Sequence, residues 1–137
     1  MGIQPKGFAS PGWVGDNPSL PTILHSCGFQ YVADDVGTSG PWQPARDGAL
    51  IRLPTDIAGP NGEAFFEAGT ARGLTKAAIV RNFLARIEGP AAHVAYDHPY
   101  FAGREGLHIV ERCIDAALER HGDCFATMGE LLMSRSR

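Results

Sequence analysis

The chain has 137 residues, enough for one domain with a sizeable core, and we expect residues 1–137 to form a single domain. Hydrophobic residues make up 44% and charged residues 20% of the chain, close to the globular average, which argues against extended disorder. The net charge is −3, and the sequence has no run of Lys or Arg. The composition therefore offers no electrostatic footprint for nucleic acid or for a membrane surface.

The N-terminal residues contain no apolar run of the signal-peptide kind, and no stretch approaches the ~20 apolar residues of a membrane-spanning helix. We therefore expect no membrane span and a cytoplasmic location for the chain as given. The three cysteines, Cys27, Cys113 and Cys124, lack CxxC spacing, so a disulfide framework and a zinc knot are poorly supported. Cys113 and Cys124 lie in apolar patterns and are expected to be buried free thiols.

The first half of the chain predicts short strands around one helix. Pro5 to Phe8 is a candidate strand, and Pro18 to Cys27 is a candidate helix for which Gly28 is a natural stop. Phe29 to Ala33 and Leu50 to Leu53 are short apolar runs typical of strands. Residues 34–49 between them are rich in glycine and proline, which predicts a loop.

The second half has clearer helical periodicity. Thr75 is a candidate N-cap for a helix through Glu88, and Gly106 to His121 predicts another helix that Gly122 ends. His93 to Tyr96 and Cys124 to Ala126 are candidate short strands. The inward positions expected for the two helices are Ile79, Val80, Phe83, Leu84 and Ile87 in the first and Leu107, Val110, Ile114 and Leu118 in the second.

The end of the chain contains a capping-box signature. Thr127 and Glu130 lie three residues apart before Leu131 and Leu132, which predicts a short final helix. The alternation of strands and helices along the chain predicts an α/β fold with mostly parallel strands joined by crossover helices. Four or five strands are compatible with an open sheet or with part of a barrel, and periodicity alone does not choose between them.

In parallel α/β folds the active site gathers where strands end. His98 follows one candidate strand and Asp34-Asp35 follow another, so we take them as candidate catalytic residues. Each also has a structural interpretation: His98 as a turn cap and the aspartates as loop formers that bond to nearby amides. Trp13 and Trp42 are either pocket walls or lids over the core. A further alternative is a metal site of mixed oxygen and nitrogen ligands made by Asp56, Asp97 and His98.

The remaining histidines have weaker functional cases. His25, His108 and His121 lie on candidate helices, where surface or packing roles are expected. His93 would begin a strand at the end away from the site, so we expect a structural role. His93 and His98 would therefore lie at opposite ends of one strand, which disfavours a shared metal.

These motifs together, in this order and spacing, resemble the polysaccharide deacetylase family, the NodB-type barrel that also includes allantoinase-like amidohydrolases and a lipid-linked aminosugar deformylase. The resemblance covers nearly the whole chain and matches the C-terminal half of that barrel. It is carried by Lys6–Trp13 (KGFASPGW), Gly28–Asp35 (GFQYVADD), Leu53-Pro54, Asp97–Pro99 with Gly103–Leu107 (GREGL), and Phe125–Thr127 with Glu130-Leu131.

The resemblance implies a partial (β/α) barrel and metal-dependent hydrolysis of non-peptide C–N bonds, in amide, N-acetyl or N-formyl groups. Family members hold a divalent metal, most often zinc, with an aspartate and two histidines from upstream motifs that have no counterpart here. We therefore expect no metal and no turnover for the isolated chain. Ala9 stands where the family often has arginine, which removes the partner of a catalytic carboxylate.

In the mechanism that the resemblance implies, His98 protonates the departing amine and Asp34 or Asp35 orients the histidine or the substrate. Pro11, Gly12, Trp13 and Trp42 would bind the substrate, a small-molecule or carbohydrate amide. The alternative is a non-catalytic half-barrel that acts as a binding or oligomerisation module. Because a half-barrel leaves strand edges unpaired, we expect a homodimer or a complementary chain.

Overall fold

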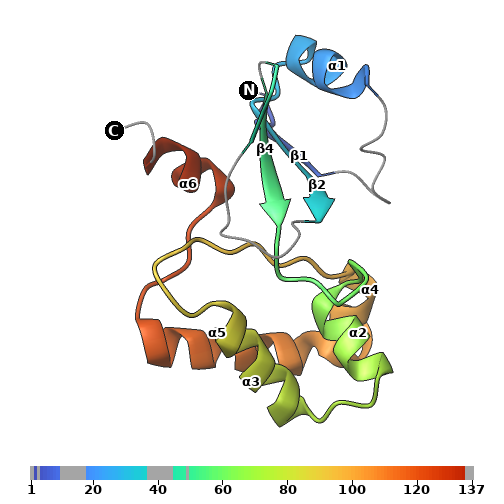
Figure 1. Ribbon diagram of the computed structural model, residues 1–137, viewed down its shortest axis with the longest axis vertical. Helices are drawn as coiled ribbons and strands as arrows, with labels where there is room; N and C mark the ends of the chain where they lie inside the picture. Colours follow the sequence, from blue (N-terminus) through green and yellow to red (C-terminus); the bar gives the residue numbers. More distant parts are fainter. Residues whose placement is uncertain (1, 3, 10–17, 37–44, 49, 135–137) are drawn as a thin grey trace. The chain divides into compact units, whose positions relative to one another are not determined.

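The computed structural model describes residues 2, 4–9, 18–36, 45–48 and 50–134 of the chain. Within these residues the fold is α/β, as the sequence predicts. The chain divides into two compact units (Figure 1): a sheet unit, Met1–Thr55 with Ala126–Arg137, and a helical unit, Asp56–Phe125. The single domain over residues 1–137 stays a prediction.

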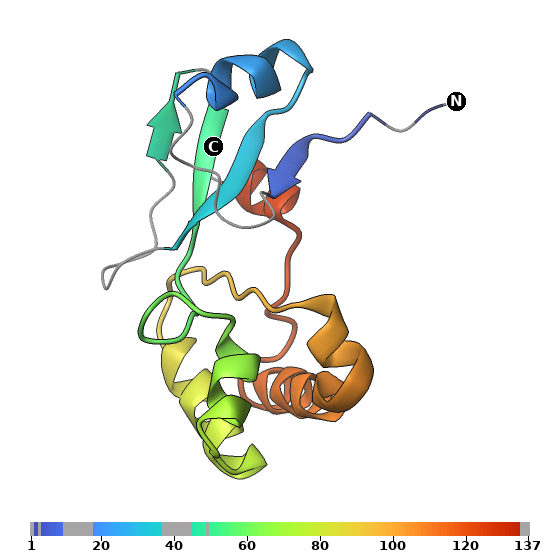
Figure 2. The same cartoon turned by 90° about the vertical axis from the view of Figure 1, so that its right-hand side faces the viewer.

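The sheet unit contains a four-stranded open sheet in the order β1-β2-β4-β3 (Figure 2). Strands β1 (Gly7–Ala9), β2 (Tyr31–Val36) and β4 (Leu50–Thr55) are parallel, and β3 (Ala45–Asp47) pairs antiparallel with β4. The prediction of mostly parallel strands is therefore confirmed. The described strands form an open sheet, and the partial barrel stays a prediction.

Strand β2 is longer than the sequence pattern predicts. Asp35 pairs with Pro54, and Val36 pairs with Thr55, so pairing with β4 extends β2 past its apolar residues. Asp34 and Asp35 therefore lie within the last residues of β2 and not in a loop beyond it, which corrects their expected position. Between Val32 and Asp35 the register shifts, because three steps on β2 match only two steps on β4, from Arg52 to Pro54.

The two faces of the sheet are covered by different helices. On one face Leu24 of α1 (Leu20–Ser26) packs with Val32 and Leu50 in a small core. Neighbouring strand residues point to the opposite face. There Tyr31 and Ile51 line a groove together with residues of α6 (Met128–Ser134). Within this unit α1 therefore packs on one face of the sheet, and α6 borders a groove at the other face.

The ends of these two helices follow the sequence signals. Gly28, with φ of 87°, has the left-handed conformation that ends α1 at little steric cost. At the start of α6, Thr127 Oγ1 accepts the N–H of Glu130 at 3.2 Å, and Glu130 Oε2 accepts the N–H of Thr127 at 2.7 Å. The predicted capping box is therefore confirmed. The Thr127 N–H, together with the Thr127 hydroxyl, holds the pKa of Glu130 below its usual value.

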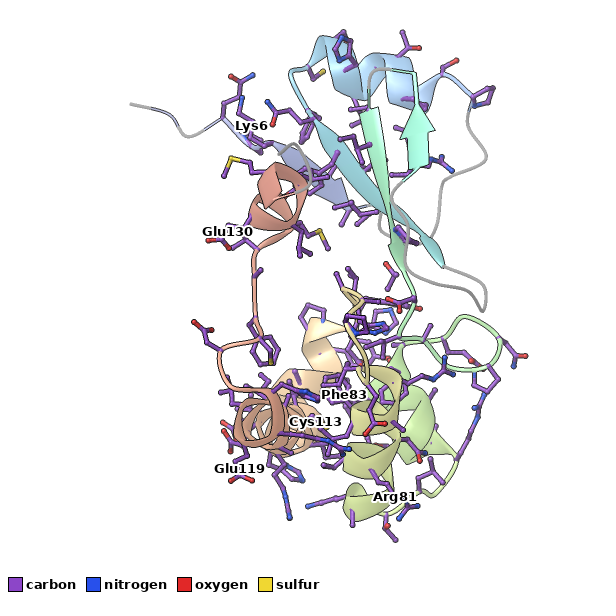
Figure 3. All side chains as sticks on the ribbon, turned by 60° about the vertical axis from the view of Figure 1, so that its left-hand side comes forward. Lys6, Arg81, Phe83, Cys113, Glu119 and Glu130 are labelled. Carbon is purple, nitrogen blue, oxygen red and sulfur yellow. The ribbon has the colours of Figure 1, made fainter. Side chains whose placement is uncertain are left out.

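The helical unit contains α2 (Phe65–Ala71), α3 (Lys76–Arg86), α4 (Pro99–Phe101), the π-helical turn η1 (Ala102–Gly106) and α5 (Leu107–His121). Thr75 caps α3 through Ala78 N at 3.2 Å, as predicted. Figure 3 shows Phe83 and Cys113 turned into the interior between α3 and α5, and Arg81 and Glu119 at the outer surface. The buried core consists of Ile57, Phe66, Ile79, Phe83, Phe101, Ile109, Cys113 and Ala117.

The sequence does not predict four of the elements, α2, β3, α4 and η1, and two predicted strands do not form. Helix α2 has only seven residues, including Gly69, too few to show helical periodicity. Strand β3 lies inside the stretch expected to be a loop. His93 to Tyr96 makes one isolated bridge, between Ala95 and Ile57, and Cys124 to Ala126 is irregular. An apolar run becomes a strand only where a partner strand lies alongside it.

The inward face of α5 differs from the predicted one. Ile109, Cys113 and Ala117, each four residues apart, are buried against the core. Leu107, Ile114 and Leu118 are 55%, 39% and 40% exposed, so three of the four predicted inward positions were wrong. The apolar stripe on α5 is wider than its contact with α3, and a stripe of this width does not show which edge is buried. On α3, Ile79, Val80, Phe83, Leu84 and Ile87 all face the core as predicted.

The exposure of each cysteine depends on the packing around it. Cys113 is fully buried, as expected, but Cys124 is exposed because no strand forms around it. Burial raises the pKa of the Cys113 thiol to about 11. Cys27 is also exposed. Among the described residues, no helix is both long enough and apolar enough to cross a lipid bilayer.

Candidate functional site

The helical unit contains a group of four polar residues, Glu67, Asp97, His98 and Tyr100, which we call the His98 cluster. The carboxylate of Glu67 is its centre. His98 Nδ1 lies 2.6 Å from Glu67 Oε2, and the Tyr100 hydroxyl donates to the other oxygen of the same carboxylate. The His98 ring stacks on the Tyr100 ring with centroids 5.4 Å apart and an interplanar angle of 18°. The bond to Glu67 and the stack on Tyr100 therefore fix the position of the imidazole.

Asp97 explains why Glu67 and His98 meet. The N-terminal N–H groups of a helix need acceptors from outside the helix, and Ala64, at the N-cap of α2, has no side chain that can supply one. Asp97 Oδ2 instead accepts Phe66 N at 2.7 Å and Glu67 N at 3.2 Å. Its other oxygen accepts the N–H of His98 at 2.9 Å. Capping α2 thus places the residue after Asp97 beside Glu67.

The electrostatics of the cluster follow from these contacts. The Tyr100 hydroxyl, and then His98, hold the pKa of Glu67 below its usual value of 4.5. The hydrogen bond to Glu67 in turn raises the pKa of Tyr100 above 10.0, because the ionised phenol would face the carboxylate. Glu67 is therefore ionised and Tyr100 neutral over a wide range around neutral pH.

The geometry of His98 suits proton transfer. Nδ1 is engaged by Glu67, and the His98 side chain is 51% exposed, so Nε2 is the ring nitrogen left for an external group. A carboxylate on one nitrogen sets the ring orientation and the tautomer, which is how proton-transferring histidines are usually held. A turn-capping role, the structural alternative, would need a bond from the side chain to the α4 backbone, and His98, the N-cap of α4, makes none.

The cluster does not suit a metal ion as it stands. Glu67, Asp97 and His98 can bring one ligand atom each within 4.8 Å of one another. However, the oxygens of Asp97 already accept three backbone N–H groups, and both oxygens of Glu67 are hydrogen-bonded. A metal here would have to displace the cap of α2. We therefore assign no metal to the His98 cluster.

A second histidine–carboxylate pair lies nearby in the chain. His93 Nδ1 is 2.6 Å from Asp56 Oδ2, and Val94 N donates to Asp56 Oδ1 at 2.8 Å. Both side chains are largely buried, with 18% and 14% of their surface exposed. Asp56 is thus engaged by His93, which corrects the alternative metal site of Asp56, Asp97 and His98: the third member of the group around His98 is Glu67.

The other predicted site residues divide into two groups. Pro11, Gly12, Trp13 and Trp42 lie outside the described residues, so their roles stay predictions. Asp34 and Asp35 belong to β2 in the sheet unit, whereas His98 belongs to the helical unit. Their pairing with His98 also stays a prediction. His25, His108 and His121 are exposed residues of α1 and α5, where the sequence places them.

Sequence reasoning missed Glu67, although a signal for it exists. Glu67 lies in the first turn of α2, where acidic residues favour the helix N-terminus, but α2 itself was not expected. Tyr100 directly follows the Asp97–Pro99 motif, yet nothing in the pattern pointed to a bond between its hydroxyl and Glu67. No family model, curated protein or solved structure matches this chain.

Proposed function

We propose that this chain is part of a metal-dependent hydrolase of the polysaccharide deacetylase type, which acts on non-peptide C–N bonds in amide, N-acetyl or N-formyl groups. His98 is its proton donor, and Glu67 and Tyr100 hold the ring. The observation that supports this most directly is the bond from His98 Nδ1 to Glu67 beside the stacked Tyr100 ring. It occurs in the Asp97–Pro99 motif, where the resemblance places the late histidine.

The chain's own residues account for one part of such a reaction. In the imidazolium form of His98 both ring nitrogens carry a proton: Nδ1–H donates to Glu67, and Nε2–H faces outward. The Nε2 proton passes to the amine nitrogen as the C–N bond breaks, which avoids expulsion of an unstable amide anion. The Glu67 carboxylate holds the ring in place and faces its positive charge before transfer. Tyr100, which is uncharged around neutral pH, holds the Glu67 carboxylate in place through its hydrogen bond.

The resemblance also implies a divalent metal, most often zinc, that would activate the attacking water. Because the His98 cluster does not suit a metal, we propose that ligands from another segment or chain hold it. Asp34 and Asp35 orient the histidine or the substrate in this proposal. Pro11, Gly12, Trp13 and Trp42 shape the pocket for a small-molecule or carbohydrate amide.

A partner is part of the same proposal. Among the described strands, β1 pairs with β2 on one side only, and an unpaired strand edge recruits further strands. We therefore propose a homodimer or a complementary chain that completes the sheet. Sedimentation of the purified chain over a wide concentration range tests this. A mass that stays monomeric at every concentration, with no chain captured from the native source, contradicts it.

The hydrolase proposal is tested on the native assembly, purified through a tag on this chain. The assay measures amine release from N-acetyl and N-formyl amino sugars and from small amides, after chelation and after zinc is restored. We expect turnover only with metal. Replacing His98 with glutamine should reduce turnover by about 10²–10⁴-fold, the usual contribution of a proton-transferring side chain.

His108→Gln is the matched control, because His108 is an exposed histidine of α5 that does not belong to the His98 cluster, and it should keep full activity. The isolated chain should bind no zinc and release no amine. Turnover that is unaffected by His98→Gln, or an assembly that is inactive towards every amide with metal present, contradicts the proposed function and favours a non-catalytic binding module.

A further inference from the structure

The segment from His93 to His98 carries the histidine of the His98 cluster but has little regular structure. It forms no helix, and its only strand-like contact is the bridge between Ala95 and Ile57. The position of such a segment must come from individual bonds, because no ladder of backbone pairs holds it. The orientation of His98 therefore depends on where the segment is anchored.

Asp56 provides the anchor at the start of this segment. One of its carboxylate oxygens contacts His93 Nδ1 at 2.6 Å, and the other accepts Val94 N at 2.8 Å. Next to it, Ile57 N donates to the carbonyl of Val94 at 3.0 Å. A single carboxylate, whose side chain is only 14% exposed, thus holds both a side chain and the backbone of the segment.

The anchors continue along the segment towards His98. The Tyr96 hydroxyl donates to the carbonyl of Gly62 at 2.6 Å, and the Asp97 carboxylate accepts Phe66 N at 2.7 Å. The Tyr96 and His98 rings meet edge to face with centroids 6.1 Å apart. The segment is therefore attached at His93 and Val94, at Tyr96, and at Asp97, the residue directly before His98.

The surroundings of the His93 ring favour one of its two tautomers. Its Nε2 is buried and has no hydrogen-bond partner among the described residues. A proton on Nε2 would be buried without an acceptor, which is costly, so we place the ring proton on Nδ1, where Asp56 accepts it. In this tautomer the ring Nδ1–H donates to the Asp56 carboxylate, which makes the contact a charge-assisted bond.

We infer that Asp56 and His93 are positioning residues for His98: their bond anchors the start of the segment whose end presents His98 to Glu67. The inference rests on the proposed function, because the orientation of His98 matters for catalysis only if His98 transfers a proton. It goes beyond that function by assigning a role to a second, largely buried histidine–carboxylate pair.

The test measures His98 directly in the full chain by long-range ¹H–¹⁵N correlation of the imidazole nitrogens. At a pH where the ring is neutral, the bond to Glu67 should keep its proton on Nδ1. We expect His93→Ala and Asp56→Ala to move His98 towards a mixture of both tautomers. Amide exchange at Phe66 and Glu67 should accelerate by roughly tenfold or more, because Asp97 no longer holds these groups firmly.

Two variants separate positioning from general stability. His93→Asn keeps an N–H donor at the place of Nδ1, so the His98 tautomer and the amide exchange rates of Phe66 and Glu67 should return to those of the wild type. Thr75→Ala removes the cap of α3 and lowers the stability of the same unit without touching the segment, so it should leave His98 unchanged. Should Asp56→Ala fail to fold, the His93→Ala and His93→Asn pair alone decides.

A folded His93→Ala protein with the wild-type His98 tautomer and unchanged exchange at Phe66 and Glu67 overturns the inference. These measurements use no hydrolysis, so they are independent of the activity assay. If the His98 tautomer depends on His93 but the assembly has no amidase activity, only the proposed function is contradicted. If turnover requires His98 but the His98 tautomer does not depend on His93, only the positioning role is contradicted.

Discussion

Asp97 caps helix α2 through the backbone N–H of Phe66, which lies thirty-one positions earlier in the chain and 2.7 Å from the carboxylate oxygen. Side-chain caps usually come from the residue directly before the helix. Here the local N-cap residue is Ala64, which has no polar side-chain atom. The cap is therefore a tertiary contact, and it is the link that brings His98 to Glu67.

Removing this cap should cost stability and disturb the cluster. We expect Asp97→Ala to lower the free energy of unfolding by about 0.5–2 kcal/mol, the range found for N-cap residues. Urea unfolding followed by circular dichroism measures the change. Asp115→Ala, at an exposed position of α5, is the control and should shift the midpoint much less. Equal losses in both variants would rule out the capping role.

Because of Glu67 and Tyr100, the stability of the fold should decrease both towards acidic and towards alkaline pH. The lowered pKa of Glu67 stabilises the fold above pH 4.5, and this contribution is lost as the pH falls through the pKa of Glu67 in the folded chain. The raised pKa of Tyr100 stabilises the fold below 10.0, and this contribution is lost as the pH rises through its folded pKa. In Glu67→Gln the first contribution should disappear and the second should shrink, because burial and Asp97 still raise the pKa of Tyr100.

The measurement is a titration of the tyrosine ring carbons by NMR. In Glu67→Gln the pKa of Tyr100 should fall towards 10.0, because the neutral amide no longer opposes the phenolate. Glu63→Gln is the control: Glu63 bonds to Asn61 and Arg72, so its loss should leave Tyr100 unaffected. A Tyr100 pKa that does not respond to Glu67→Gln would show that the hydrogen bond is absent in solution.

Two glycines of the π-helical turn η1 should differ sharply in their tolerance of alanine. A Cβ at Gly106 would overlap the ring of Phe101, which is buried in the core, whereas a Cβ at Gly103 would meet open space. We expect Gly106→Ala to cost about 1–3 kcal/mol through overpacking. Gly103→Ala should change stability by less than about 1 kcal/mol in either direction. Thermal unfolding of both variants tests this, and similar melting temperatures would contradict the packing around Phe101.

Cys113 should react far more slowly than the other two cysteines. It is fully buried, and at about pH 8 a thiol with a pKa of about 11 is only about 0.1% thiolate, which is the reactive form. Cys27 and Cys124 are exposed. Alkylation of the native chain followed by mass spectrometry should show two fast labels, with the third appearing only in denaturant. Fast labelling of Cys113 in the folded chain would contradict the burial of α5 against α3.

Local signals in the sequence predicted much of the fold correctly. Thr75 and the pair Thr127 and Glu130 identify helix starts because they bond to backbone groups only three residues away. Gly28 and Gly122 identify helix ends because they reach positive φ without steric cost. The parallel sheet followed from the order of short apolar runs. Each of these features depends on residues close together in the chain.

The candidate site was only partly predictable. His98 was recognised from its motif, but its partner Glu67 lies thirty-one residues away in a helix too short for its periodicity to show. The buried edge of α5 was also misjudged, because Ile109 and Ile114 are equally apolar and only contact with α3 distinguishes them. Neither relationship leaves a mark within a local window of sequence.

The sequence by itself determined where α3 and α6 begin, where α1 and α5 end, and that a histidine stands beside Asp97. Only the tertiary structure decided that Asp97 caps α2, that Glu67 therefore holds His98, and that Asp56 anchors His93. The physical reason is that caps and glycine stops are satisfied within one turn of chain. A carboxylate that accepts N–H groups thirty residues away is placed by the packing of the whole unit.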